Sequence, residues 1–248
     1  MSLCKDCVSG ATHEGVPSGK IEEIAGVKTY VALPPEGTVY DKMKAVLFVA
    51  DAFGIDLVNN QLLAYVFAKN GIQTYLPDHL NGDPVVELNA SFDFPSWLAK
   101  HGTEQTRPPL DKVVDALKEK GVTSFGATGY CFGARYVFDL AFDGVIKAAR
   151  RLSSFAPQGA RGSGEVQGNW RAAAYQLLRE TDLAYPAESQ KLGDEILGGG
   201  KTETESYKRA YFPKCVHGFA VRGDLSIPEV KFGKGAILRE CSGFKEKL

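Results

Sequence analysis

The chain has 248 residues, of which 44% are hydrophobic and 24% are charged, and its formal net charge is -1. This length and composition indicate a globular protein, and the balanced charge without a basic stripe argues against nucleic-acid partners. No apolar run is long enough to span a membrane, and the segment after Met1 lacks the hydrophobic core of a signal peptide, so we expect a cytoplasmic protein without membrane partners.

The N-terminal segment carries Cys4 and Cys7, two of the five cysteines of the chain. An odd number of cysteines argues against a complete disulfide framework. A structural zinc site needs four ligands, and no second Cys-x-x-Cys pair is present, so we expect no metal. We interpret residues 1–25 as an N-terminal arm. A thiol redox protein that uses Cys4 and Cys7 is one alternative function.

The first half of the folded region alternates strand and helix patterns. Val27, Thr29, Val31 and Leu33 alternate with other residues, and this period of two predicts a first strand. The continuous apolar run 45–50 fits a central parallel strand that is buried on both faces. Helical spacing of apolar residues over 58–66 predicts a helix that ends at Gly71, and 72–76 predicts the next strand.

The second half repeats this alternation. An amphipathic helix is predicted over 110–117, with Pro108 and Pro109 in its first turn and Gly121 at its end. The remaining expected elements are strands at 173–178 and 207–212, helices at 187–197 and 228–246, and a loop at 156–170. This alternation indicates an α/β fold with a mostly parallel sheet, helices on both faces and a single domain over 26–248.

The segment Gly129-Tyr130-Cys131-Phe132-Gly133 is the most informative feature of the chain. It follows an apolar stretch at 125–128 and precedes an amphipathic stretch that includes Tyr136, Val137 and Leu140. Strand, tight turn and helix in this order predict the nucleophile elbow of an α/β-hydrolase, with cysteine where serine is usual. Two glycines allow the sharp turn, and the helix N-terminus favours a thiolate and later an oxyanion.

A thiol nucleophile needs a base and an acid that orients the base. In α/β-hydrolases the chain order is nucleophile, acid, histidine. Asp182 and His217 follow Cys131 in that order, and each lies just after a predicted strand. Such loops meet at the carboxyl edge of the sheet, where open α/β folds bind ligands. We therefore predict a triad of Cys131, Asp182 and His217.

Other residues compete for these roles. His79 follows a strand and is the alternative base, but it precedes the nucleophile. Glu180 and Asp194 are alternatives to Asp182. His101 follows a predicted helix end, where capping of carbonyl groups is the structural role that we expect.

The oxyanion hole needs two N–H donors. One is predicted to be the backbone amide of Phe132, the residue after the nucleophile. The other is predicted in the loop after the strand at 45–50, where Ala52 has the appropriate position. Asp51 would then lie close to Cys131.

These motifs resemble the dienelactone hydrolase family, and most of all its fungal members. The matching segments are 3–7, 51–55, 81–84, 106–110, 129–133 and 217–224. The resemblance implies an α/β-hydrolase fold, a Cys-Asp-His triad and hydrolysis of a small lactone or ester without a cofactor. It also implies that Asp51 matches an acid that holds the thiol proton before substrate binds, and that Arg222 grips a substrate carboxylate. We expect a monomer or a homodimer.

The chain departs from the family pattern over 148–170. Arg150 and Arg151 stand where a buried strand is expected, and buried charges are costly unless they reach solvent. This departure motivates an alternative, a hydrolase-fold binding protein with an impaired site.

Overall fold

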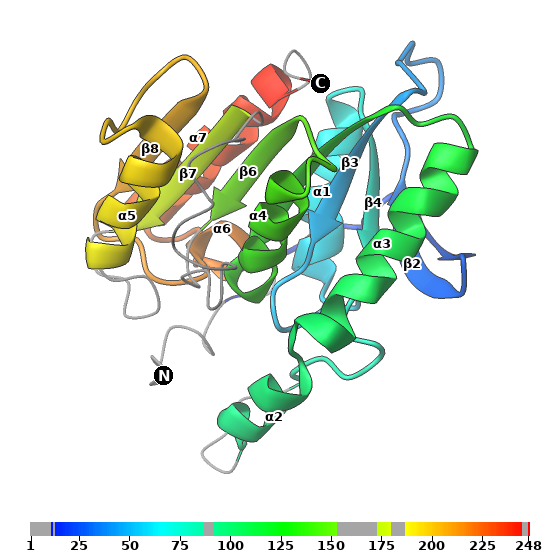
Figure 1. Cartoon of the computed structure of the whole chain (residues 1–248), viewed down its shortest axis with the longest axis horizontal. Helices are drawn as coiled ribbons and strands as arrows, with labels where there is room; N and C mark the ends of the chain where they lie inside the picture. The colour runs from blue at the N-terminus through cyan, green and yellow to red at the C-terminus, as the bar shows by residue number, and fades with distance from the viewer. Residues whose placement is uncertain (1–10, 12, 87–91, 153–172, 180–186, 245–247) are drawn as a thin grey trace.

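The computed structural model describes residues 11, 13–86, 92–152, 173–179, 187–244 and 248. Its centre is an eight-stranded sheet with the order β1-β2-β4-β3-β5-β6-β7-β8 (Figure 1). The strands are β1 (Lys20–Ile24), β2 (Val27–Ala32), β3 (Lys44–Val49), β4 (Gln73–Pro77), β5 (Ser124–Tyr130), β6 (Ala148–Leu152), β7 (Ala173–Arg179) and β8 (Tyr207–Phe212). β2 pairs antiparallel with β1 and β4, and all other neighbours pair in parallel.

Helices cover both faces of this sheet. They are α1 (Val58–Lys69), α2 (Phe94–Lys100), α3 (Thr103–Glu119), α4 (Ala134–Phe142), α5 (Ala187–Gly198), α6 (Phe219–Arg222) and α7 (Pro228–Phe244), with the 3₁₀ turn η2 (Cys131–Gly133). Figure 1 shows α3 and α4 in front of the sheet and α1 and α7 behind it. The mostly parallel α/β fold predicted from the sequence is confirmed.

The central strand β3 contributes side chains to the hydrophobic cores on both faces of the sheet. Alternate side chains of a strand point to opposite faces. Ala45, Leu47 and Val49 accordingly join the core beneath α3 and α4, whereas Val46 and Phe48 join the core beneath α1. All five are fully buried.

Two elements differ from the sequence-based expectation. β1 is an additional edge strand within the range that we interpreted as an arm. α3 begins at Thr103, so Pro108 and Pro109 lie inside it and the prediction that they form its first turn is wrong. Pro109 has no N–H to donate to the carbonyl of Gln105, four residues earlier in the helix. The side-chain amide of Asn81 donates to that carbonyl instead, at 2.9 Å, so the helix tolerates Pro109.

The segment that departs from the family pattern is partly described. β6 runs through Arg150 and Arg151 and pairs with β5 and β7 in the middle of the sheet, as predicted for this position. The expected loop at 156–170 lies outside the described residues, as do Cys4 and Cys7.

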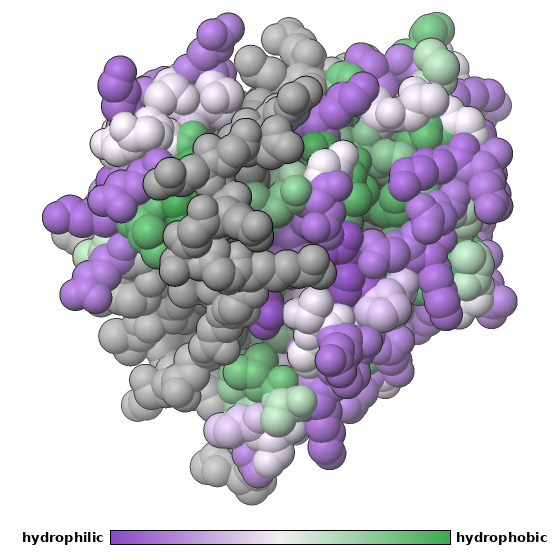
Figure 2. Space-filling view, in the orientation of Figure 1, coloured by the Kyte–Doolittle hydropathy of each residue, from purple (hydrophilic) through white to green (hydrophobic). Residues whose placement is uncertain are grey.

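Helix α3 has a hydrophilic side toward solvent and an apolar side toward the sheet. On the face shown in Figure 2, hydrophilic side chains predominate over α3. The apolar side of this helix, formed by Leu110, Val113, Val114 and Leu117, is buried against the sheet as its spacing predicted. In the part of the chain that the structure describes, no helix has the length and apolar character that crossing a membrane requires.

Candidate active site

The turn at Cys131 has the geometry of a nucleophile elbow. Cys131 itself adopts φ 50°, a left-handed conformation that is rare and strained for any residue except glycine. A Cβ atom on Gly129 would lie 2.6 Å from Val137 Cγ2, and one on Gly133 would lie 2.3 Å from the carbonyl oxygen of Ala50. Both glycines are therefore needed for the close packing of β5, η2 and the end of β3.

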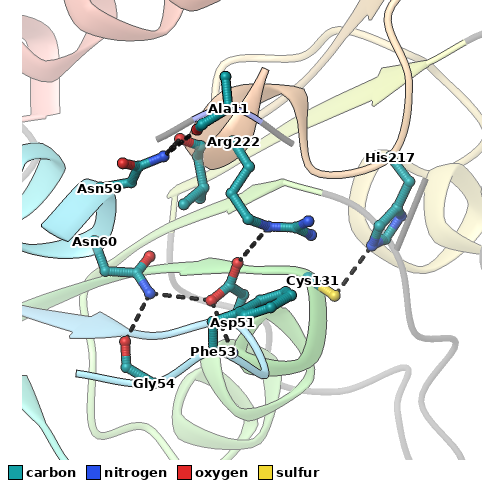
Figure 3. Close-up of polar contacts among 10 residues, drawn as sticks. Ala11, Asp51, Phe53, Gly54, Asn59, Asn60, Cys131, His217 and Arg222 are labelled. Carbon is teal, nitrogen blue, oxygen red and sulfur yellow. Dashed lines mark hydrogen bonds and ion pairs between the residues drawn. The ribbon is translucent and has the colours of Figure 1, made fainter. Parts of the chain in front are cut away.

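His217 lies beside the sulfur of Cys131, as the sequence predicted for a nucleophile and its base. Its Nε2 atom is 3.0 Å from Cys131 Sγ, and Figure 3 shows the ring pointing at the sulfur. The loop after β8 places this ring, and it reverses direction at Gly218, which has φ 80°. Both side chains are largely buried, with exposed fractions of 8% for Cys131 and 3% for His217. Proton transfer between sulfur and imidazole needs no further movement at this distance.

Asp182, predicted to orient His217, lies outside the described residues, and so does its rival Glu180. The other rival, Asp194, is engaged elsewhere. Its carboxylate accepts a hydrogen bond of 2.8 Å from the Tyr207 hydroxyl and pairs with Arg209 at 3.1 Å. Asp194 therefore has a structural role between α5 and β8.

Asp51 forms a buried ion pair close to the elbow. Its Oδ2 accepts from Arg222 Nε at 3.1 Å, and its Oδ1 accepts from the Asn60 amide at 3.0 Å and from the Phe53 backbone at 3.2 Å. The guanidinium also lies 4.5 Å from the centre of the Phe53 ring (Figure 3). Among the described residues no hydrogen bond joins Asp51 to Cys131. The carboxylate is thus directed at Arg222, and the thiol at His217.

The loop that carries Ala52 emerges beside the elbow, where the second oxyanion donor was predicted. β3 and β5 are parallel neighbours, with Val49 opposite Gly129, so both chains leave the sheet at the same edge. The carbonyl of Ala52 accepts from Val85 N at 2.8 Å, which fixes the loop. The backbone of Ala52 and that of Phe132 therefore lie at the same edge of the sheet.

His79, the alternative base, lies instead in an aromatic cluster. Its ring stacks on Phe132 and meets Tyr136 edge-on, with 5.9 Å between ring centres in both cases. The side chain is fully buried, and neither ring nitrogen has a hydrogen-bond partner among the described residues. Burial lowers the pKa of His79 to about 4, so the ring is neutral near pH 7.

His101 has the capping role that the sequence suggested. It is the residue that ends α2, and its Nδ1 lies 2.7 Å from the carbonyl oxygen of Trp97. Its ring stacks on the Trp97 ring at 4.0 Å, in the same aromatic cluster as Phe132.

Replacing His79 with phenylalanine should flatten the acid dependence of stability. The unfolded chain binds the proton of His79 below pH 6.5, whereas the folded protein binds it only near pH 4. Stability therefore falls as pH drops from 6.5 to 4, by about 3 kcal/mol from this residue. Urea unfolding of both proteins at several pH values measures the difference, and equal slopes would contradict the assignment.

Asn60 is a residue of the candidate site that sequence reasoning missed. It lies in α1, where an asparagine on a helix is usually solvent-exposed, yet it is fully buried. Its amide donates both to Asp51 and to the carbonyl of Gly54, at 2.8 Å. The only available signal was an asparagine pair, Asn59 and Asn60, at the start of the helix that follows the loop with Ala52.

A metal site is not apparent in this region. Within the described ranges, no three or more histidine, cysteine or acidic side chains come close enough together to hold a metal ion.

The parallel sheet, the glycine-flanked elbow and the histidine from the loop after the last strand define an α/β-hydrolase. A family model described as the dienelactone hydrolase family matches residues 27–237. The chain therefore belongs to the dienelactone hydrolase family, and it is a hydrolase that acts on ester or lactone bonds.

Individual relatives agree with this assignment. Hydrolase pyvD of Aspergillus violaceofuscus is 30% identical over 92% of this chain and 89% of its own length. Dienlactone hydrolase 1 of Gibberella moniliformis is 31% identical over 91% of this chain and 85% of its own length. The structure of the dienelactone hydrolase-like promiscuous phosphotriesterase P91 from metagenomic libraries superimposes with a TM-score of 0.67. It is 18% identical, covering 92% of this chain and 98% of that chain, and so supports the fold alone.

Proposed function

We propose that this protein hydrolyses a small lactone or ester through a covalent intermediate on Cys131. The observation that carries the proposal is the 3.0 Å contact between Cys131 Sγ and His217 Nε2 at a strained elbow. An activated nucleophile within hydrogen-bond reach of its base is the arrangement that nucleophilic catalysis requires.

In the first half of the reaction, the sulfur attacks the carbonyl carbon while His217 takes the thiol proton. The negative charge that develops on the carbonyl oxygen is stabilised by the backbone amides of Phe132 and Ala52. The carbon–oxygen bond then breaks, and the protonated His217 gives its proton to the departing oxygen. For a lactone, the released hydroxyl stays attached to the acyl group.

In the second half, water attacks the thioester and gives a proton to His217. The carbon–sulfur bond breaks, the thiolate regains the proton and the carboxylic acid leaves. Asp182 is proposed to accept a hydrogen bond from His217 Nδ1, which keeps Nε2 directed at the sulfur. No cofactor is needed, because every proton and electron pair comes from the substrate, water and these side chains.

Arg222 is proposed to bind a carboxylate of the substrate. Its guanidinium is buried beside the nucleophile, with 5% of the side chain exposed, and it lies against Gly218, where a Cβ atom would be 2.7 Å from Nη2. A buried guanidinium in this position favours an anionic group on the substrate. Asp51 holds it in place until then, and the family resemblance adds a role in holding the thiol proton.

The proposal is tested by trapping the intermediate. The enzyme is mixed with p-nitrophenyl acetate and quenched in acid. Mass spectrometry of the intact protein and of its peptides should then show one acetyl group, on Cys131. Asp182→Asn should lower kcat by about 10²- to 10⁴-fold, because the imidazole loses its orienting partner. Glu180→Gln is the matched control and should retain most activity. Turnover without any adduct on Cys131 would refute the mechanism, and the opposite ranking of the two variants would transfer the acid's role to Glu180.

A further inference from the structure

The turn that carries Arg222 is too short to hold its own position. α6 has four residues, Phe219–Arg222, and lies between Gly218 and Gly223. A single helical turn is unfavourable in isolation, because its nucleation is not offset by further hydrogen bonds. The last carbonyl groups of any helix also lack partners within the helix. Contacts from outside α6 must therefore fix Arg222.

Three consecutive carbonyl groups at the end of α6 have such partners. The Asn59 amide donates to the Val221 oxygen at 2.9 Å, and the backbone N–H of Ala11 donates to the Arg222 oxygen at 2.8 Å. The Nε2 atom of His13 lies 2.9 Å from the Gly223 oxygen. Residues from α1 and from the segment before β1 together cap a helix to which neither belongs.

Asn59 joins these partners into one unit, which we call the arm clamp: Ala11, His13 and Asn59. Besides its bond to α6, the Asn59 amide donates to the Ala11 oxygen at 2.8 Å (Figure 3). Its Oδ1 accepts from the backbone N–H of His13 at 2.8 Å. Asn59 is almost fully buried, so loss of this side chain would leave several polar groups without partners.

His13 is held from its other side as well. Lys234 of α7 contacts the Nδ1 atom of its ring. Because an ammonium group can only donate, Nδ1 accepts from Lys234 and Nε2 carries the proton that is donated to the Gly223 oxygen. This tautomer satisfies both contacts at once and ties the segment before β1 to α6 and α7.

The neighbouring Asn60 holds the other member of the Asp51–Arg222 pair. Adjacent residues of a helix point about 100° apart, so Asn59 and Asn60 reach different partners from one place in α1. Asn60 binds the Asp51 carboxylate, and Asn59 binds the turn that carries Arg222. The start of α1 therefore holds both members of the Asp51–Arg222 pair.

We propose that the arm clamp positions Arg222 for carboxylate recognition, so that Asn59 and His13 are positioning residues and Ala11 and His13, which precede β1, support the active site. This deepens the proposed function and rests on it for the role of Arg222, but the position of α6 can be tested independently of any activity.

The test uses the full chain with four variants. Asn59→Ala and His13→Ala remove the clamp, His13→Gln restores a side-chain donor, and Asn70→Ala is the control. Asn70 also belongs to the α1 region, but its amide donates to the Val66 carbonyl of the same helix. Hydrogen exchange of the amides of 219–223 is measured, together with kcat and KM for p-nitrophenyl acetate and for mono-p-nitrophenyl succinate, which adds a carboxylate.

If the clamp acts as proposed, exchange at 219–223 rises at least about tenfold in Asn59→Ala and His13→Ala. KM for the succinate ester rises about tenfold with little change for the acetate ester, and His13→Gln recovers most of the loss. Asn70→Ala matches the original protein in both measurements. The half-buried His13 keeps the test valid if Asn59→Ala does not fold.

Two results would overturn the proposal: unchanged exchange at 219–223 in His13→Ala, or equal losses for both esters, which indicate only a structural role. If the original protein does not discriminate between the esters, the role of Arg222 in the proposed function fails. Exchange at 219–223 then decides the clamp alone, so the two failures are distinguishable.

Discussion

Replacing Cys131 with alanine should lower kcat/KM for an activated ester by at least about 10³-fold. The variant lacks the proposed nucleophile, whereas His217 and the proposed oxyanion donors are unchanged. Folding should be preserved, because alanine keeps the Cβ atom and can adopt the same left-handed backbone at similar strain. Initial rates with p-nitrophenyl acetate and the thermal unfolding midpoint measure the two effects.

Cys215 provides a matched control in the same protein. It is a buried free cysteine whose sulfur lies 3.6 Å from the carbonyl oxygen of Glu229, whereas His217 contacts the sulfur of Cys131. Burial, followed by the nearby Glu229 charge, raises the pKa of the Cys215 thiol to about 11, so it stays protonated and unreactive near neutral pH. Cys215→Ala should retain most activity. Activity that survives Cys131→Ala but not Cys215→Ala would reassign the nucleophile.

Local patterns in the sequence were sufficient to predict most of the fold. The apolar run 45–50 fitted a doubly buried strand, and residues 45–49 of β3 are fully buried. The limits of β8 match the predicted 207–212, and Pro213 directly follows its last residue. The elbow was predictable because only two glycines around a residue with positive φ allow strand, turn and helix to pack this closely.

Features that depend on tertiary contacts could not be predicted from the sequence. β1 has only Ile24 buried and is otherwise charged or partly exposed, so it carries no strand periodicity. It forms because Ala25 and Gly26, both with positive φ, turn the chain back onto β2. No periodicity marks this pairing, since the strand lies at the edge of the sheet.

In the candidate site, too, some contacts were predictable from the sequence and others were not. The chain order of Cys131 and His217 predicted their contact, because both follow strands that end at one edge of the sheet. The pairing of Asp51 with Arg222 joins residues 171 positions apart, and the family resemblance implied only a substrate-binding role for Arg222. The buried asparagines of α1 were missed because helix position alone does not reveal what a neighbouring turn requires.

Replacing Gly133 with alanine should destabilise the protein by at least about 3 kcal/mol and abolish activity with it. The backbone of Gly133, at φ -68°, would suit alanine, so the effect is steric. The new Cβ atom would lie 2.3 Å from the Ala50 oxygen and 2.4 Å from the Val49 oxygen. These are backbone atoms at the end of the central strand, and any shift separates the elbow from the loop that carries Ala52.

Gly102→Ala is the matched control for this change. Gly102 also has an ordinary φ of -72°, but its new Cβ atom would meet only Gln105 Oε1, at 3.2 Å, which is the far end of a flexible side chain. It should lose less than about 1 kcal/mol. Urea unfolding of both variants measures the difference, and a Gly133→Ala protein as stable and active as Gly102→Ala would show that β3 and the elbow are not in contact. Because the predicted oxyanion hole is built from those two segments, that result would remove its structural basis as well.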